Sequence, residues 1–387
     1  MMEPTSYAIT RRESIYLDFV RALAALFVVL DHAPTLFDLP NGPRWGHQAV
    51  VVFFVLSGYV ICNVADTRET NGPTFLIARL ARLWSVLVPA MVLTVVCDTA
   101  GRYWGHNAWA YADIHDNAPL IRVGAVLGFL SESWVSIQPL SNGVIWSLCN
   151  EFWYYVLFAA WTFVPPGKAR IAALMVAAAL SGHKALLLLP VWLMGVVLQR
   201  SWKLRGLSFA TGTLLWCGSL AVIAWVLMSH IYVPAINAMN AVVNPWVMTQ
   251  LAQSRVFWLD WLLGLVIAAH LVGARSFSAR LPLERVARPV RWCAGISFAA
   301  YLFHMPLLYF CAAFLSKESG VLAIVITLVA IALIGPWVES TKGWWRRMLS
   351  RIYVNVLINR TQRACLLTNR SAIDAVVAQS PEGPFHH

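Results

Sequence analysis

The sequence is poor in charged residues. Asp, Glu, Lys and Arg make up 12% of its 387 residues, whereas about a quarter of the residues in soluble domains are charged. Hydrophobic residues make up 59%, and the mean hydropathy is +0.65. This balance excludes a soluble globular domain. It predicts an all-α polytopic membrane protein.

Metal-binding and disulfide patterns are also missing. The seven cysteines form no CxxC pair and most lie in apolar runs, so we expect neither a disulfide framework nor a metal cluster. Possible ligands in one loop lack the spacing of a metal site: His106, Asp113, His115 and Asp116. The first apolar run has no small-residue cleavage site, which predicts a retained helix rather than a signal peptide.

Ten apolar segments approach the length of about 20 residues that a helix needs to cross a bilayer. They lie at about 17–34, 48–65, 84–101, 144–164, 169–182, 185–199, 208–230, 256–274, 293–315 and 320–339. We therefore expect about ten transmembrane helices in one bundle. An N-terminal cytoplasmic arm at 1–15 would precede the membrane domain at 16–339, and a basic, partly disordered cytoplasmic tail at 340–387 would follow it.

The net charge of +11 is explained by topology rather than by nucleic-acid binding. With ten helices and both termini cytoplasmic, 22 basic residues lie inside, six lie outside and Arg21 lies in the membrane, as the positive-inside rule requires. Fusing the short fifth and sixth segments would move fifteen inside residues outward. We expect a multi-pass protein of a bacterial-type inner membrane. Two outer loops, 102–143 and 231–255, could shape an acceptor site.

The first apolar run carries Arg21 near its start and the pair Asp31-His32 near its end. Eleven helical steps amount to three turns plus about 20°, so Arg21 and His32 lie on one stripe, roughly 16 Å apart along the axis. Two ionisable groups on one stripe indicate a polar path through the membrane. His32 suits a general base that Asp31 orients or stabilises. The alternative is a histidine at the headgroup boundary with Asp31 facing water.

Two further patterns follow the first run. Ser57 and Gly58 are small residues that let membrane helices approach closely. Arg79 and Arg82 are three residues apart and share a helix face at the inner end. Such a pair can hold a phosphate-bearing ligand, although contact with lipid headgroups and a purely topological role are equally simple explanations.

The fourth segment begins near Trp146 and Ser147 and places Glu151 within an apolar helix, which is costly unless the carboxylate has a partner. We expect that partner to be Arg21, His32 or His304. The ninth segment contains Tyr301 and a second intramembrane histidine, His304, just before the helix-weakening Pro306. Taken alone, His304 is better explained as a structural histidine that forms a hydrogen bond to a neighbouring helix.

These stretches together resemble the acyltransferase-3 family of membrane acyltransferases. Arg21 to His32 is similar to the family's Arg/Lys-x10-His motif, and VVFFVLSGYVI at 51–61 to its FFVLSG block. Arg79-Leu80-Ala81-Arg82 is similar to Arg-x-x-Arg, WSLCNE at 146–151 to WSLxxE, and ISFAAYLFHMP at 296–306 to ISYxxYLxHxP. The five blocks occur in the family's order. One departure is Asn142-Gly143, where the family block usually begins Ser-Gly.

The resemblance implies transfer of an acyl group, expected to be acetyl, from acyl-CoA to a hydroxyl of a sugar or glycoconjugate, without a metal. It implies that His32, directly or through Glu151, activates the hydroxyl, and that Arg79 and Arg82 hold the CoA phosphates. Arg21 would orient the donor or stabilise the oxyanion. Supporting roles for substrate contact or packing fall to Ser57, Trp146, Ser147, Tyr301 and His304.

A transporter or flippase is the competing hypothesis. In that case the intramembrane Arg, His and Glu side chains would relay protons or pass an anionic lipid-linked sugar. Transporters often contain internal repeats, and the two halves of this sequence show no convincing repeat. Consumption of a thioester that depends on an acceptor would distinguish an acyltransferase from a transporter.

Overall fold

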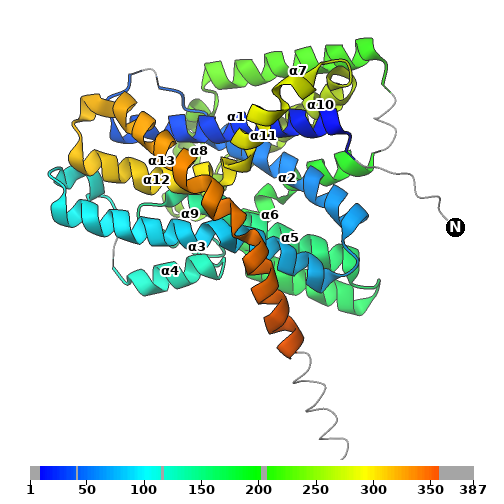
Figure 1. The fold of residues 1–387 in the computed structure, drawn as a ribbon, viewed down its shortest axis with the longest axis horizontal. Helices are drawn as coiled ribbons and strands as arrows, with labels where there is room; N and C mark the ends of the chain where they lie inside the picture. Colours follow the sequence, from blue (N-terminus) through cyan, green and yellow to red (C-terminus); the bar gives the residue numbers. More distant parts are fainter. Residues whose placement is uncertain (1–8, 41, 115–116, 202–206, 357–387) are drawn as a thin grey trace, which may run out of the picture.

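The computed structural model describes residues 9–40, 42–114, 117–201 and 207–356. These residues form helices joined by loops and contain no β-strand (Figure 1). The longer helices are α1 (Arg11–Leu36), α2 (Gly46–Arg68), α3 (Gly72–Trp104), α5 (Trp146–Phe163), α6 (Lys168–Arg200), α7 (Phe209–Ser229), α10 (Phe257–Ser278), α12 (Ser297–Phe314) and α13 (Gly320–Ser340). The shorter helices are α4 (Pro119–Leu127), α8 (Tyr232–Val242), α9 (Pro245–Leu251) and α11 (Ala287–Gly295). The 3-10 turns are η1 (Ala108–Tyr111), η2 (Gly143–Ile145), η4 (Ala252–Ser254), η5 (Leu283–Val286) and η6 (Lys317–Ser319).

Local sequence signals fix where several helices begin. Thr10 caps α1 by accepting a hydrogen bond from the backbone N–H of Glu13 at 3.2 Å, as in the first half of a capping box. Asn71 caps α3 in the same way through Thr74, at 3.0 Å, and Pro73 follows at the start of the helix, where a missing N–H costs nothing. α1 then packs against α2, α10, α11, α12 and α13.

Seven helices of the described chain are long and apolar enough to cross a membrane. They are Gly46–Arg68, Gly72–Trp104, Lys168–Arg200, Phe209–Ser229, Pro245–Ser276, Ser297–Phe314 and Lys317–Val356. α1 and α5 are of comparable length but carry charged or polar side chains along part of their course. A multi-pass helical membrane protein is therefore confirmed, and the expected number of ten spans stays a prediction.

The fifth and sixth apolar segments form α6, which changes direction at Gly182, a residue with non-helical backbone angles (φ 79°, ψ 170°). Both ends of α6 lie beside α5. Arg170 donates to the carbonyl of Val164 at 2.7 Å, and Arg200 lies over the ring of Phe158 at 5.7 Å. A straight helix of this length would hold its ends about 50 Å apart, so α6 folds back on itself. The positive φ favours glycine at this turn.

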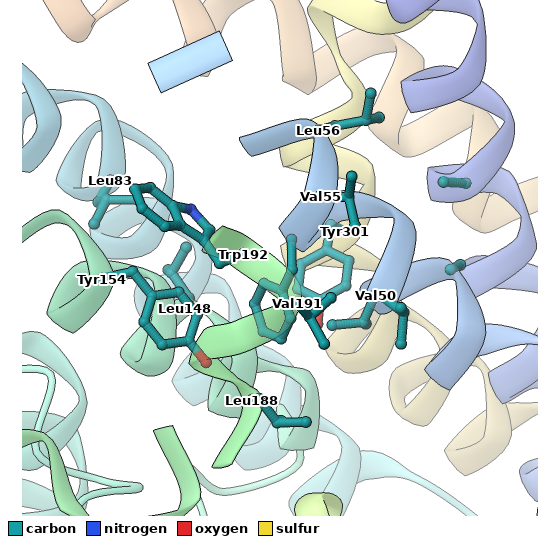
Figure 2. Packing of buried hydrophobic residues seen from close by; sticks show 14 of the residues in the cluster. Val50, Val55, Leu56, Leu83, Leu148, Tyr154, Leu188, Val191, Trp192 and Tyr301 are labelled. Atoms are coloured by element: carbon teal, nitrogen blue, oxygen red, sulfur yellow. The ribbon is translucent and has the colours of Figure 1, made fainter. Parts of the chain in front are cut away.

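Buried side chains of α2, α5, α6 and α12 form the core beside the site (Figure 2). Trp192 of α6 is fully buried and lies close to Tyr154 of α5, with ring centroids 5.9 Å apart. Gly58 lets α2 approach α6 closely at the same place, because a Cβ atom on Gly58 would lie 2.0 Å from the carbonyl oxygen of Trp192. The sequence-based expectation that small residues near Ser57 allow close helix approach is thus confirmed for Gly58.

Helices extend past both expected ends of the membrane domain, whose boundaries stay a prediction. α1 begins at Arg11, so the last residues of the expected arm at 1–15 belong to the helix. The expected tail at 340–387 contains helical residues 342–356, and its remainder lies outside the described residues. The expected outer loop at 231–255 is also helical, because it contains α8 and α9.

Candidate active site

A cavity of about 250 Å³ lies between α1, α2, α3, α5 and α12. It collects most of the polar residues that the sequence singled out on separate helices. They are Arg21, Ser57, Arg79, Arg82, Ser147, Glu151 and Tyr301. The packing of the helices brings together side chains from sequence positions as far apart as 21 and 301. Pockets for drug-sized ligands measure about 300–1,000 Å³, so this cavity suits the reactive end of a larger substrate.

Glu151 is held by two hydroxyl groups. Its Oε1 atom accepts hydrogen bonds from Ser57 Oγ and Tyr155 Oη, each at 2.5 Å. Trp192 Nε1 in turn donates to Ser57 Oγ at 3.2 Å. The expected direct partner, Arg21, His32 or His304, is therefore wrong as a hydrogen-bonding partner. Hydroxyl donors satisfy the carboxylate and leave its charge uncompensated at close range.

Three arginines face the same cavity. Arg79 lies 5.7 Å from the ring of Phe75, and its buried Nε has no hydrogen-bond partner among the described residues. Arg82 makes a loose ion pair with Glu339 at 3.7 Å, and its side chain is 38% exposed. An anionic ligand can accept hydrogen bonds from the unpaired Nε–H of Arg79 and from the loosely paired guanidinium of Arg82.

The third arginine, Arg21, enters the cavity from α1, whereas the other two belong to α3. Its closest ion-pair partner is Asp18, one turn earlier on α1, at 3.4 Å. Glu151 lines the same cavity from α5, and Glu339 pairs with the cavity residue Arg82. Arginines thus outnumber these two carboxylates, and the cavity favours a negatively charged ligand or transition state.

His32 does not line this cavity but faces α12. Its Nδ1 atom bonds to the carbonyl of Val28 at 2.8 Å and lies 3.3 Å from Nε2 of the fully buried His304. Asp31 lies 3.9 Å from the same Nδ1, too far for a hydrogen bond. Asp31 therefore does not orient His32 through a hydrogen bond, and Val28 with His304 orients the ring instead. The Asp31 carboxylate still lies close enough to stabilise the charged form of the imidazole. The bond across helices expected for His304 is present.

Tyr301 lies between the cavity and the histidine pair. Its hydroxyl is 2.6 Å from Ser147 Oγ and donates to the carbonyl of Val144 at 2.9 Å. Its ring centroid is 6.4 Å from that of His304, one turn later on α12. A polar series therefore runs from Ser147 through Tyr301 and His304 to His32.

Asn142 explains the departure from the Ser-Gly pattern. The side chain is fully buried, and its Nδ2 donates to Thr94 Oγ1 at 3.1 Å and to the carbonyl of Leu302 at 2.9 Å. These bonds connect the start of η2 to α3 and α12. A serine hydroxyl has only one hydrogen to donate, so asparagine ties both helices to the segment that carries Trp146 and Ser147.

Sequence reasoning missed several residues of the site. Tyr155 is four residues after Glu151 and so shares its helix face, a spacing that could have identified it. Glu339 is an ionisable residue at the end of an apolar run, which is also an available signal. Phe298 lines the cavity and lies 5.6 Å from the Arg82 guanidinium, a contact that no local pattern indicates. The described residues contain no group of three or more His, Cys, Asp or Glu side chains placed to hold a metal ion.

Comparisons with known proteins show which proteins the sequence resembles. A family model for an acyltransferase domain, of the acyltransferase-3 type, matches residues 14–338. The O-acetyl transferase of Shigella phage Sf6 is 27% identical over 220 residues, which are 50% of this chain and 60% of that protein. This match therefore spans less than two thirds of the phage protein. Protein 2 in the picA locus of Rhizobium radiobacter is 30% identical over 179 residues, 42% of this chain and 90% of that protein. No solved structure matches the chain.

Proposed function

Because the chain belongs to the acyltransferase-3 family, we propose that it transfers an acetyl group from acetyl-CoA to a hydroxyl of a sugar or glycoconjugate. The observation that carries this proposal is the cavity in which Arg21, Arg79 and Arg82 meet Glu151. Arginines at membrane depth are costly unless they serve a ligand or a partner. The relationship to a phage O-acetyl transferase supports acetyl as the group transferred and oxygen as the atom that receives it.

Arg79 and Arg82 are proposed to bind the phosphates of the donor. The free Nε of Arg79 and the exposed, loosely paired guanidinium of Arg82 provide donors for phosphate oxygens. Arg21 would stabilise the negative charge that develops on the thioester oxygen during transfer.

His32 is proposed to accept the proton of the acceptor hydroxyl. Donation of the Nδ1 hydrogen to the carbonyl of Val28 leaves the lone pair on Nε2. A neutral imidazole is a suitable base near pH 7. The proton leaves the hydroxyl for His32, the oxygen forms a bond to the acyl carbon, and the C–S bond breaks to release thiolate.

The proposed setting is a bacterial-type inner membrane with both termini in the cytoplasm. The distribution of basic residues supports this orientation. It places Arg79 and Arg82 at the inner face, where acetyl-CoA is present, and His32 toward the outer face, where glycan acceptors are found. The bilayer and a glycan are thus the expected partners.

The direct test supplies acetyl-CoA and glycan acceptors to the purified protein and measures release of free thiol. We expect release by the wild type that depends on the acceptor. In the Arg79→Ala/Arg82→Ala variant, we expect the KM for acetyl-CoA to rise by about a hundredfold, since charge-assisted hydrogen bonds contribute about 1.5–3 kcal/mol each.

Arg200→Gln is the matched control for the arginine variant. Arg200 lies outside the cavity and pairs with Asp66 at 3.1 Å, so its loss should leave the KM for acetyl-CoA unchanged. Equal affinity for acetyl-CoA in the wild type and in the double variant would contradict the donor role. Glycan or proton movement in proteoliposomes without thiol release would favour the transporter hypothesis instead.

A further inference from the structure

A second histidine with a buried carboxylate lies outside the residues assigned above. His47, at the start of α2, places Nε2 2.9 Å from Oδ1 of Asp260 on α10. Tyr232 of α8 donates to the same oxygen at 2.9 Å. Asp260 is fully buried, whereas the His47 side chain is 24% exposed. Three helices thus hold one imidazole at the surface of the bundle.

The hydrogen bonds fix which nitrogen of His47 can meet a ligand. A carboxylate accepts hydrogen bonds, so Nε2 of His47 carries the hydrogen and Nδ1 carries the lone pair. Within the described residues Nδ1 makes no hydrogen bond. Trp146 lies nearly parallel to the ring, with centroids 6.0 Å apart and planes at 14°, and this stacking fixes the plane of the imidazole. An oriented ring with a free acceptor is ready to receive a donor from outside the chain.

The position of His47 connects it to the cavity. Val50, three residues later on the same helix face, lines the cavity, and so does Ser147 beside Trp146. The Asp31 carboxylate of α1 lies directly beside Gly46, the residue that precedes His47. His47 therefore lies one turn from the cavity, at the end of α2 that meets the Asp31-His32 end of α1.

We propose that His47 binds the hydroxyl-bearing acceptor, accepting a hydrogen bond from a sugar hydroxyl at Nδ1, with Asp260 as its positioning residue. This inference rests on the proposed acyltransferase function. It assigns an acceptor subsite to α2, α8 and α10, opposite the arginine end of the cavity. The helical segment α8, which supplies Tyr232, contributes a wall of this subsite.

The test measures the KM for acceptor and for acetyl-CoA with a panel of methyl hexopyranosides and envelope polysaccharide. In His47→Gln we expect the KM for acceptor to rise about tenfold, because one hydrogen bond to the acceptor is lost. The KM for acetyl-CoA should stay unchanged. Asp260→Asn should do the same, and His47→Gln/Asp260→Asn should be no worse than either single variant, because both remove one unit. Tyr232→Phe, which removes one bond to Asp260, is the milder variant if Asp260→Asn does not fold.

The matched control is His183→Gln. His183 also packs near a tryptophan, Trp134, and bonds to the carbonyl of Gln250 at 3.0 Å. An unchanged KM for acceptor in His47→Gln, or an equal change in His183→Gln, would overturn the inference. Absence of thiol release by the wild type with every acceptor would instead overturn the proposed function.

A separate observation concerns the helical residues 342–356 that follow α13. α13 alone has the length to cross a bilayer, and with these residues the helical run extends from 317 to 356. Figure 1 shows the added helix, in orange to red, extending away from the bundle. Trp345 contacts Trp84 of α3, with ring centroids 5.9 Å apart, so the helix leaves the bundle at the level of Arg82.

The added helix has one apolar face and carries four basic residues around the rest of its surface. The apolar positions recur at helical spacing and are Trp345, Met348, Leu349, Ile352 and Val356. At about 100° per residue, Arg347 and Arg351 lie on the opposite side together with the apolar Trp344 and Val354. Lys342 and Arg346 flank the apolar face, and no residue of 342–356 is acidic. The exposed fractions of Ile352 and Val356 are 53% and 45%. We infer that this helix lies in the plane of the membrane on anionic lipid headgroups, with its apolar face in the acyl boundary.

The test places a polarity-sensitive fluorophore on Ile352→Cys in a chain whose native cysteines are replaced by serine. In nanodiscs we expect blue-shifted emission that is stronger with phosphatidylglycerol than with phosphatidylcholine alone. The same label on Ser350→Cys, on the side away from the apolar face, should report water. Arg346→Gln/Arg347→Gln/Arg351→Gln should remove the dependence on anionic lipid. Water-like emission from Ile352→Cys in both lipids, or a shift that appears only with two copies per disc, would overturn the inference.

Discussion

Replacing His32 with asparagine is expected to lower kcat for acetyl transfer by about 10²–10⁴-fold, the usual contribution of a general base. The reason is that Nε2 carries the lone pair once Nδ1 has donated to the carbonyl of Val28. Asparagine keeps a polar side chain at this position but accepts a proton far less readily. Thiol release with saturating acetyl-CoA and acceptor gives kcat directly.

Two variants separate a basic role of His32 from a structural one. His230→Asn is the matched control, because His230 lies in a left-handed conformation at the end of α7 that asparagine tolerates. Asp31→Asn should change kcat much less than His32→Asn, since the Asp31 carboxylate is 3.9 Å from the ring. Full activity in His32→Asn would contradict the assignment. Acetylated His32, trapped by mass spectrometry without acceptor, would show that transfer passes through a covalent intermediate.

The first helix shows how far the sequence alone reaches. Its periodicity correctly places Arg21 and His32 on one helix, because helical geometry depends only on local spacing. It does not indicate that His32 faces His304 while Arg21 faces the cavity. That division depends on α12 packing against α1, a contact between residues 272 positions apart. No local pattern encodes the contacts of a long-range helix pair.

Glu151 shows the same limit of prediction from the sequence. Apolar neighbours correctly identify it as a carboxylate that needs a partner. A charged partner is the simplest expectation, yet two hydroxyls, Ser57 and Tyr155, hold it. Hydroxyls are too common in membrane helices to stand out in a sequence, whereas arginine and histidine are rare there. Likewise, the hydrogen bond between His47 and the buried Asp260 joins two segments whose polar residues show no distinctive spacing.

Glu151→Gln is expected to lower kcat by about a hundredfold while leaving the fold intact. Glutamine has nearly the same shape and can still accept hydrogen bonds from Ser57 and Tyr155 through its carbonyl oxygen. The substitution removes only the negative charge. Among the described residues that line the cavity, this carboxylate is the one that lies beside the arginines and is bonded to hydroxyls. The measurement is kcat from thiol release, with the thermal unfolding midpoint determined in the same detergent.

Tyr155→Phe provides the control for Glu151. It removes one hydrogen bond to the carboxylate but leaves the charge in place, so a catalytic role of the charge predicts a smaller loss of kcat than in Glu151→Gln. If Glu151 serves only to join α5 to α2 through Ser57, Glu151→Gln would retain activity, whereas Ser57→Ala would lower the unfolding midpoint. A carboxylate that acts in the chemical step further implies that Glu151→Gln changes the KM for acetyl-CoA less than it changes kcat.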